Sequence, residues 1–283
     1  MKKGERKVLD YGDVLLREAD VELLEGPHWL NDQIVSFYFE YLEREALPAT
    51  SAAAAISGVL LLPPATSFLL MHAGPDMAGD ILGPLKPHSR GLVLLPVNDN
   101  PDVDRAAGGS HWSLLVFHRP SNTLRHYDSS GGSGNAAAAK RLAAAVGPAL
   151  QPPGAGGGGS GSSGSGSSGT GSSGASGGGP RFVEVVDTPR QCNGYDCGVY
   201  VLAVARAACE RWCLGPAVAE GAAEGAAGAA AEAGAAGRGE DGEAGGEGSW
   251  REWERGLRAL ITPAAVKALR REVREVIREK AGE

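Results

Sequence analysis

The sequence lacks the features that mark nucleic-acid-binding, membrane-spanning and secreted proteins. Its formal net charge is −7, so it has no basic surplus for a phosphate backbone, and we expect no nucleic-acid partner. No window approaches the ~18 apolar residues that a membrane span requires, so we expect no association with a membrane. No apolar stretch follows the charged N-terminus, so we expect no signal peptide and a location in the cytoplasm or nucleus.

Cysteine is also scarce, with four in 283 residues: Cys192, Cys197, Cys209 and Cys213. In a reducing compartment we expect these to remain thiols. A zinc site would need four ligands at tighter spacings with histidines nearby, so we expect neither a metal nor a cofactor. Cys209 and Cys213, four residues apart on an expected helix, are interpreted as small buried hydrophobic residues.

Two tracts of biased composition interrupt the patterned sequence. Residues 151–180 contain 14 Gly and 9 Ser, and residues 214–248 are rich in Ala, Gly and Glu, with seven acidic residues against Arg238. The first tract cannot bury enough apolar surface to offset the entropy of ordering it, so we expect it to be flexible. The second allows helix in patches, but its glycines argue against a stable helix. Patterned sequence resumes after each tract, so we interpret residues 1–283 as one domain that carries two inserted loops. The remaining roughly 210–220 residues suffice for one full core.

The polar turn at residues 191–196 leads directly into an apolar run at residues 199–204. This pattern predicts a tight turn followed by a buried helix that starts at Cys197. The positive end of a helix dipole favours thiolate, the nucleophilic form of cysteine. Cys197 is therefore a candidate nucleophile, and the alternative is that it is a small buried hydrophobic residue.

Residues 111–117 and 123–128 are apolar runs separated by the turn residues 119–122, which predicts an antiparallel hairpin. His111, near the start of the first strand, and Asp128, near the end of the second, would then lie side by side. Further strands are expected at residues 59–62, 92–97 and 181–186. Helices are expected at residues 31–45, 63–72, 76–85, 136–150, 197–214, 250–260 and 263–280.

A cysteine nucleophile needs a base, a group that orients the base, and donors for the oxygen that gathers charge. The chain offers His111 as the base for Cys197 and Asp128 to orient it. Gln191 can donate its amide to an oxyanion hole beside the backbone N–H of Cys197. These residues favour thiol acyl-transfer chemistry, but their spacing alone does not prove it. The alternative makes His111 a capping or core histidine.

Trp29 lies just before the helix expected at residues 31–45. It can either pack as a hydrophobic staple or form a flat wall of a substrate channel. His118 and His126 lie in the expected hairpin, where surface or cross-strand roles are predicted. No cysteine or carboxylate pattern surrounds the remaining histidines.

Three motifs in order resemble the ubiquitin-like-protein-specific cysteine proteases, the sentrin/SUMO protease family of the adenain-like, papain-related clan. They are Trp-Leu-Asn-Asp at 29–32, His-Trp-Ser-Leu-Leu at 111–115 with Tyr-Asp-Ser at 127–129, and Gln-x-Asn-Gly-Tyr-Asp-Cys-Gly at 191–198. The ordered match extends over nearly the whole chain outside the two biased tracts. The resemblance implies an α+β fold with a mixed, mainly antiparallel central sheet flanked by helices, and a nucleophile at a helix N-terminus.

The same resemblance implies roles for individual residues. The triad and its oxyanion donor would be His111, Asp128, Cys197 and Gln191. Trp29 and Trp112 would enclose the channel for the C-terminal Gly-Gly of the substrate. A narrow aromatic channel suits glycine, because no side chain could pass through it.

One subgroup of the family looks most similar. Val-Asn-Asp-Asn at 97–100 and the stretch at 106–116 resemble the deneddylases, which act on the Rub/Nedd-type modifier. Asn98 and Asp99 are accordingly expected to bind substrate. The resemblance implies a monomeric protease that processes the modifier precursor after Gly-Gly. It would also cleave the isopeptide bond to lysine in conjugates such as cullin-type targets.

Three other functions remain open at this point. A SUMO-directed protease is the nearest alternative. An acyltransferase of the same architecture is another, and the paired tryptophans Trp29 and Trp112 argue instead for a Gly-Gly substrate. The third is an inactive module that only binds a modifier. The complete set of Cys, His, Asp and Gln argues against that, because a binder needs none of them.

Overall fold

The computed structural model describes residues 4–105, 108–132, 134–152, 179–215 and 247–282. The two tracts interpreted as inserted loops, 151–180 and 214–248, fall almost entirely outside these residues, so the single domain with two loops stays a prediction. No helix in the described ranges is both long enough and apolar enough to cross a membrane.

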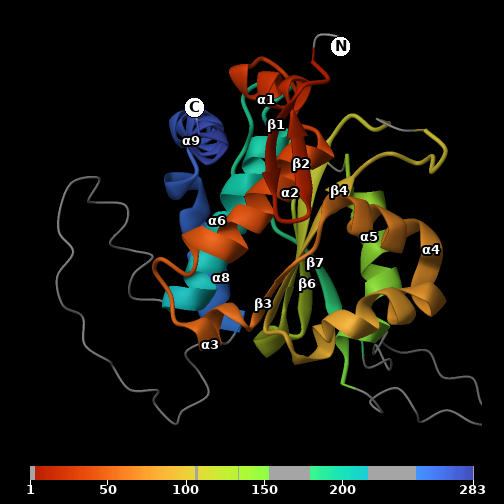
Figure 1. Cartoon of the computed structure of the whole chain (residues 1–283). Helices are drawn as coiled ribbons and strands as arrows, with labels where there is room; N and C mark the ends of the chain where they lie inside the picture. Colours follow the sequence, from red (N-terminus) through yellow and green to blue (C-terminus); the bar gives the residue numbers. More distant parts are fainter. Residues whose placement is uncertain (1–3, 106–107, 133, 153–178, 216–246, 283) are drawn as a thin grey trace, which may run out of the picture.

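A five-stranded sheet runs through the middle of the molecule (Figure 1). In order across the sheet, its strands are β3 (Val59–Leu61), β4 (Leu92–Asn98), β5 (Trp112–His118), β6 (Thr123–Tyr127) and β7 (Arg181–Glu184). The sheet is mixed, as predicted. The central pairs β4–β5 and β5–β6 are antiparallel and contain most of the paired residues, as expected for a mainly antiparallel sheet, while both outer pairs, β3–β4 and β6–β7, are parallel. Parallel neighbours need a crossover, and the helices α4 (Pro64–Leu82) and α5 (Ala136–Val146) provide the two crossovers.

The other elements lie outside this sheet. The strands β1 (Lys7–Tyr11) and β2 (Val14–Arg17) form a separate antiparallel hairpin. The remaining helices are α1 (Glu18–Glu22), α2 (Asp32–Tyr41), α3 (Ala53–Ile56), α6 (Cys197–Leu214), α8 (Glu247–Leu260) and α9 (Pro263–Ala281). Side-chain caps fix two helix starts. Asn31 Oδ1 accepts from the Ile34 N–H at 3.1 Å, and Thr262 Oγ1 accepts from the Ala265 N–H at 3.2 Å.

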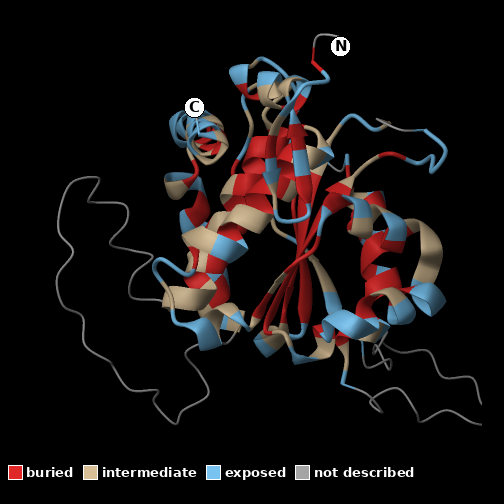
Figure 2. Cartoon of the chain, viewed as in Figure 1, coloured by how far each residue is buried: buried red, intermediate tan, exposed pale blue. Residues whose placement is uncertain are grey.

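Helices cover both faces of the sheet, so its strands are buried on two sides (Figures 1 and 2). Successive side chains of a strand point to opposite faces, and β4 shows the consequence. Leu92 and Leu94 join the core formed with α2, α6, α8 and α9. Val93 and Leu95 join a second core formed with α4 and α5. This explains why the strands read as continuous apolar runs in the sequence rather than as alternating ones.

A buried ion pair fixes α8 to the sheet. Arg125 on β6 is 2% exposed, and its Nε donates to Glu254 Oε1 at 2.7 Å while its Nη2 donates to the second carboxylate oxygen. The Tyr127 hydroxyl also donates to Glu254 Oε1, at 2.6 Å, and Trp250 Nε1 donates to the Tyr127 oxygen at 3.1 Å. Both carboxylate oxygens are therefore used, and Glu254 connects α8 to β6.

Replacing Glu254 by glutamine is expected to destabilise the protein strongly. The guanidinium of Arg125 would stay buried without a compensating charge, and removing one member of a buried pair costs about 3–5 kcal/mol. Urea unfolding followed by circular dichroism measures the difference in the free energy of unfolding. Glu252→Gln on the exposed face of α8 is the matched control and should change that free energy little. Equal stability of the two variants would contradict the role given to the pair.

Candidate active site

Cys197 is the first residue of α6, as the sequence predicts, and it is 1% exposed. The first N–H groups of a helix have no partner within the helix, so the backbone donors of this turn point toward the thiol. Gly198 lets this helix start pack closely against the segment that follows Trp29. A Cβ at position 198 would come within 2.9 Å of the Leu30 Cβ. A glycine is therefore needed where the nucleophile helix meets Leu30.

The hairpin of β5 and β6 brings His111 and Asp128 together. His111 directly precedes β5, Asp128 directly follows β6, and Leu114 pairs with Tyr127 across the two strands. His111 Nε2 lies 2.7 Å from Asp128 Oδ1. The other hydrogen-bonding partner of the imidazole is the thiol of Cys197. The three predicted residues thus form one chain of contacts from carboxylate to imidazole to thiol.

Electrostatics favour a protonated imidazole at His111 beside an ionised carboxylate at Asp128. Burial alone lowers the pKa of His111, but the hydrogen bonds to Asp128 and Cys197 outweigh it and raise this pKa to about 10. Burial raises the pKa of Asp128, yet hydrogen bonds from His111 and from Ser130 lower it to about 2. Near neutral pH the carboxylate is therefore ionised and the imidazole carries a proton. This is the arrangement that a thiolate–imidazolium pair requires.

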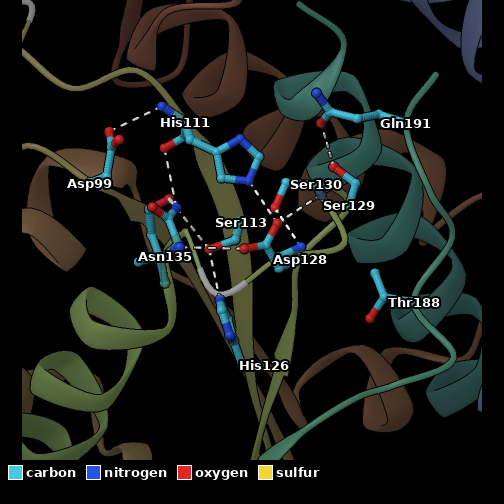
Figure 3. A network of polar contacts seen from close by, with 12 residues as sticks. Asp99, His111, Ser113, His126, Asp128, Ser129, Ser130, Asn135, Thr188 and Gln191 are labelled. Carbon is cyan, nitrogen blue, oxygen red and sulfur yellow. Dashed lines mark hydrogen bonds and ion pairs between the residues drawn. The ribbon is translucent and has the colours of Figure 1, made fainter. Parts of the chain in front are cut away.

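Asn135 supports this pair from beneath and was not predicted from the sequence (Figure 3). Its backbone N–H and that of Ser130 donate to Asp128, at 3.4 and 2.9 Å. Its side-chain amide lies 3.2 Å from the carbonyl oxygens of Val97 and His111 and 2.9 Å from Ser113 Oγ. Asn135 is fully buried. An asparagine just before a helix predicts only an N-cap, so this role could not be predicted from the sequence.

The two other hairpin histidines are buried, which corrects part of the expectation for them. His126 is 1% exposed and makes cross-strand contacts, with Nδ1 2.8 Å from Glu184 Oε2 on β7 and Nε2 2.8 Å from Ser113 Oγ on β5. His118 is also 1% exposed, and its ring stacks on Trp250 at 4.3 Å. Burial lowers the pKa of His118 to about 4. Neither histidine lies on the surface, because both faces of the sheet are covered.

Gln191 lies next to the triad through Ser129, the residue after Asp128 (Figure 3). Its Oε1 accepts from Ser129 Oγ at 2.8 Å, and its backbone N–H donates to the Ser129 carbonyl at 2.9 Å. Its Nε2 donates to the Asn193 carbonyl at 2.7 Å, which leaves the second N–H of the amide for another acceptor. Hydrogen bonds at both the oxygen and the nitrogen of the amide thus fix the orientation of the Gln191 side chain.

Trp29 and Trp112 both line a hollow of about 570 Å³, together with His111, Asn98 and mainly apolar residues. We call this hollow the entry groove. Trp29 is 50% exposed, and its Nε1 donates to the carbonyl of Gly194. Gly194 lies in the turn at residues 191–196, which leads into Cys197 and which we call the nucleophile turn. Trp112 Nε1 donates to the Leu30 carbonyl at 2.9 Å. Trp112 also lines a second, small hollow beside the Cys197 side chain. Trp112 therefore borders both the entry groove and the small hollow at Cys197.

Of the two other expected substrate residues, Asn98 lines the entry groove and Asp99 does not. The Asp99 carboxylate is occupied within the protein. It accepts from the hydroxyl of Ser110 at 2.7 Å and from the His111 N–H at 3.0 Å. Burial raises the pKa of Asp99, but these donors outweigh it and lower the pKa below its ordinary value. We therefore propose that Asp99 positions the backbone of His111 instead of binding substrate.

The four cysteines are free thiols, and Cys192 is exposed while Cys209 is buried. Within the part of the chain that the structure describes, no group of three or more His, Cys, Asp or Glu side chains could hold a metal ion. The site itself offers a thiol, an imidazolium, a carboxylate and amide donors. Together these suit acyl transfer through a thioester.

Comparison with known proteins gives related sequences and related folds. The chain is 37% identical to NEDD8-specific protease 1 of Arabidopsis thaliana over 206 residues, which cover 72% of this chain and 76% of that protein. It is 35% identical to sentrin-specific protease 8 of Homo sapiens, over 72% of this chain and 82% of that protein. No protein-family model matches. The solved C-terminal Ulp1 protease domain in complex with Smt3, the yeast ortholog of SUMO, shares the fold at a TM-score of 0.54. At 13% identity it covers 100% of this chain and 91% of that domain.

Proposed function

Because the chain belongs to the family of NEDD8-specific and sentrin-specific proteases, which are cysteine peptidases, we propose that it cleaves after the C-terminal Gly-Gly of a Rub/Nedd-type modifier. One observation carries the proposal. The imidazole of His111 contacts both the carboxylate of Asp128, at 2.7 Å, and the thiol at the start of α6. Two reactions follow, processing of the modifier precursor and cleavage of the isopeptide bond that joins the modifier to a lysine.

In the proposed reaction the Cys197 thiolate attacks the carbonyl carbon of the last glycine. The carbonyl oxygen gathers negative charge, which the backbone N–H of Cys197 and the free N–H of the Gln191 amide stabilise. The imidazolium of His111 gives its proton to the leaving amine as the C–N bond breaks and a thioester remains. His111 then removes a proton from water, which attacks the thioester and releases the carboxylate and the thiol. Asp128 keeps the imidazole oriented throughout.

The channel between Trp29 and Trp112 explains the preference for glycine. A thiol that is 1% exposed is reached only by a chain thin enough to enter between the two rings. Each indole N–H is held by a backbone carbonyl, Trp29 by Gly194 and Trp112 by Leu30, so neither ring is free to turn away. A side chain on either of the last two substrate residues would meet these rings, whereas glycine has none.

We assign the modifier to the Rub/Nedd type because the relative at 37% identity, NEDD8-specific protease 1 of Arabidopsis thaliana, acts, by name, on NEDD8. Asn98 lines the entry groove, which supports the proposal that it contacts the residues of the tail that precede Gly-Gly. We further propose that the protein works as a monomer in the cytoplasm or nucleus, on conjugates such as cullin-type targets. Nothing in its proposed reaction requires a cofactor, a metal or a nucleic acid.

The choice of modifier is tested by comparing three substrates side by side. Rub/Nedd-type, SUMO and ubiquitin molecules, each with the same fluorogenic leaving group after Gly-Gly, are compared by kcat/KM. We expect the Rub/Nedd-type substrate to exceed the other two by at least about 100-fold, equivalent to about 2.7 kcal/mol of transition-state binding. Preference for SUMO would instead support the SUMO-directed alternative. Binding without turnover would support an inactive module, and transfer of the acyl group to a protein amine in place of water would support an acyltransferase.

A further inference from the structure

Arg270 on α9 is a buried cation with several partners near the active site. Only 6% of the residue is exposed. Its Nε and Nη2 donate to Asp196 Oδ1 at 3.1 and 2.8 Å. Its Nη1 donates to the Leu23 carbonyl at 2.6 Å, and Nη2 also donates to the carbonyls of His28 and Tyr195 at 3.0 and 3.4 Å. One guanidinium therefore uses donors on all three of its nitrogens.

These partners belong to two segments that border the substrate channel. Asp196 and Tyr195 form the end of the nucleophile turn, immediately before Cys197. Leu23 and His28 lie in the segment that leads into Trp29. The hydrogen bond from Trp29 to Gly194 already joins these two segments across 165 residues of sequence. Arg270 is thus a second connection between them, and it comes from a third part of the chain.

The carboxylate of Asp196 is held from both sides. Arg270 donates to Oδ1, and the side-chain amide of Asn193 donates to Oδ2 at 2.7 Å. Asn193 Oδ1 in turn accepts the backbone N–H groups of Tyr195 and Asp196, at 3.1 and 3.0 Å. The hydrogen bonds of Asn193 therefore hold the turn in one conformation. The attachment of the turn to the rest of the protein includes a buried Arg–carboxylate pair, in which Arg270 Nε and Nη2 both donate to Asp196 Oδ1. Such charge-assisted hydrogen bonds are roughly twice as strong as neutral ones.

We propose that Arg270 is a positioning residue for catalysis, which holds the turn that carries Cys197 at a fixed distance from the segment that carries Trp29. The substrate part of this inference rests on the function proposed above. A guanidinium can do this because its planar fork binds a carboxylate and several carbonyls at once, which an ammonium cannot. Arg270 touches no reacting atom, so its effect passes through the position of Cys197 and the width of the channel.

The proposal predicts two changes in the variant Arg270→Met, which keeps an unbranched side chain of similar reach. The rate with a substrate that ends in Gly-Gly should fall by about 10–100-fold, since displacement of a reacting group by ~1 Å costs about that much. The preference for Gly-Gly over a substrate in which the last glycine is alanine should also become smaller, by about 10-fold, because a looser channel admits a methyl group. Both rates are divided by the concentration of active sites, measured by titration with a small alkylating agent.

Arg271→Met is the matched control, because Arg271 is the exposed neighbour of Arg270 on the same helix. It should leave both the rate and the preference unchanged. Arg270→Lys keeps the charge without the fork, and it should show an intermediate loss of preference even if the methionine variant folds poorly. Asp196→Asn should reduce the rate and the preference less than Arg270→Met, since it weakens only the contact with the Asp196 carboxylate and leaves the contacts of Arg270 with Leu23 and His28. The double variant should be no worse than Arg270→Met alone, since that change already releases the shared contact.

A merely structural role for Arg270 would lower the fraction of active protein without changing the preference per active site. An unchanged ratio of the Gly-Gly to the Gly-Ala rate in both Arg270→Met and Arg270→Lys would therefore overturn the proposal. The proposed function fails in a different way, through absence of hydrolysis by the wild-type protein. In that case the rate of alkylation of Cys197 by iodoacetamide still tests the inference. We expect it to differ between Arg270→Met and Arg271→Met, and equal rates would refute the positioning role.

Discussion

Replacing Cys197 by alanine should abolish hydrolysis of the Gly-Gly bond while leaving the fold intact. The thiol supplies the bond-forming electron pair, and removal of a triad nucleophile costs about 10⁶-fold in kcat. Alanine is smaller than cysteine by a single sulfur atom and fits the start of α6, so we expect circular dichroism and the unfolding midpoint to change little. A single-turnover assay with excess enzyme measures the remaining rate. The variant should still bind the modifier, because the entry groove is unchanged.

The chain offers a matched control in Cys192→Ala. Cys192 is exposed and lies in the same turn, five residues before Cys197, yet it has no part in the proposed chemistry. A modifier with a C-terminal electrophile should form one adduct with the wild type and with Cys192→Ala, and none with Cys197→Ala. The two other thiols should not react, since burial raises the pKa of Cys209 and of Cys213. An adduct of equal yield with Cys197→Ala would falsify the assignment of the nucleophile.

The parts of the fold that depend on local patterns were predictable from the sequence. The hairpin that joins His111 to Asp128 follows from two apolar runs and a turn, and the helix that starts at Cys197 follows from a polar turn and an apolar run. The sequence also separates two helical pieces before and after Gly74, and the structure shows the reason. Gly74 adopts φ of 79°, a left-handed conformation that interrupts α4 just before Pro75.

The contacts that support the site could not be predicted, because they join residues that are far apart in sequence. Arg270 reaches the nucleophile turn across more than 70 residues, and Glu254 reaches Arg125 across 129. From the sequence, Asn135 is only a candidate helix cap. Its contacts with β4 and β5 exist only in the folded protein. The parallel pairing of β3 and β7 could not be predicted either. Whether a strand pairs parallel or antiparallel depends on the path of the connecting segment, not on the composition of the strand.

Replacing Asp128 by asparagine should reduce kcat by about 10³–10⁴-fold, the second-largest effect expected in this protein. Asparagine has the same shape, but its amide offers only one acceptor oxygen to the groups that Asp128 now serves. These are the imidazole of His111 and the backbone N–H groups of Ser130 and Asn135. If the oxygen stays with the backbone donors, the amide N–H₂ faces the imidazole and stabilises the wrong tautomer. Steady-state kinetics with the Rub/Nedd-type substrate measures the loss.

The pH dependence of kcat provides a second, independent test of the role of Asp128. Asp128 helps to raise the pKa of His111 to about 10, while burial acts in the opposite direction. Without the carboxylate the burial remains, so the imidazole should lose its proton at a lower pH. The alkaline limb of the kcat profile should therefore move to lower pH in Asp128→Asn. An alkaline limb at the same pH as in the wild type would show that Asp128 does not act on the imidazole.

Stability should depend on pH in a way that follows from both members of the pair. The pKa of Asp128 is lowered to about 2 from 3.8, so its contribution is full above pH 3.8 and is lost as the pH falls toward 2. The pKa of His111 is raised from 6.5 to about 10, so its contribution is full below pH 6.5 and is lost as the pH rises toward 10. The wild type should therefore exceed Asp128→Asn in unfolding free energy most clearly between pH 4 and 6.5, by on the order of 2 kcal/mol.

Asp80→Asn on the exposed face of α4 is the control for the loss of one negative charge far from the site. It should leave kcat, the alkaline limb and the stability difference unchanged. Urea unfolding at pH 2, 5 and 10 then separates two explanations. If the unfolding free energy of Asp128→Asn falls below that of the wild type most strongly at pH 5, and less at both extremes, the His111–Asp128 pair is the source of the difference. A deficit of the same size at all three values would mean that the asparagine is a steric defect, because a steric defect does not titrate.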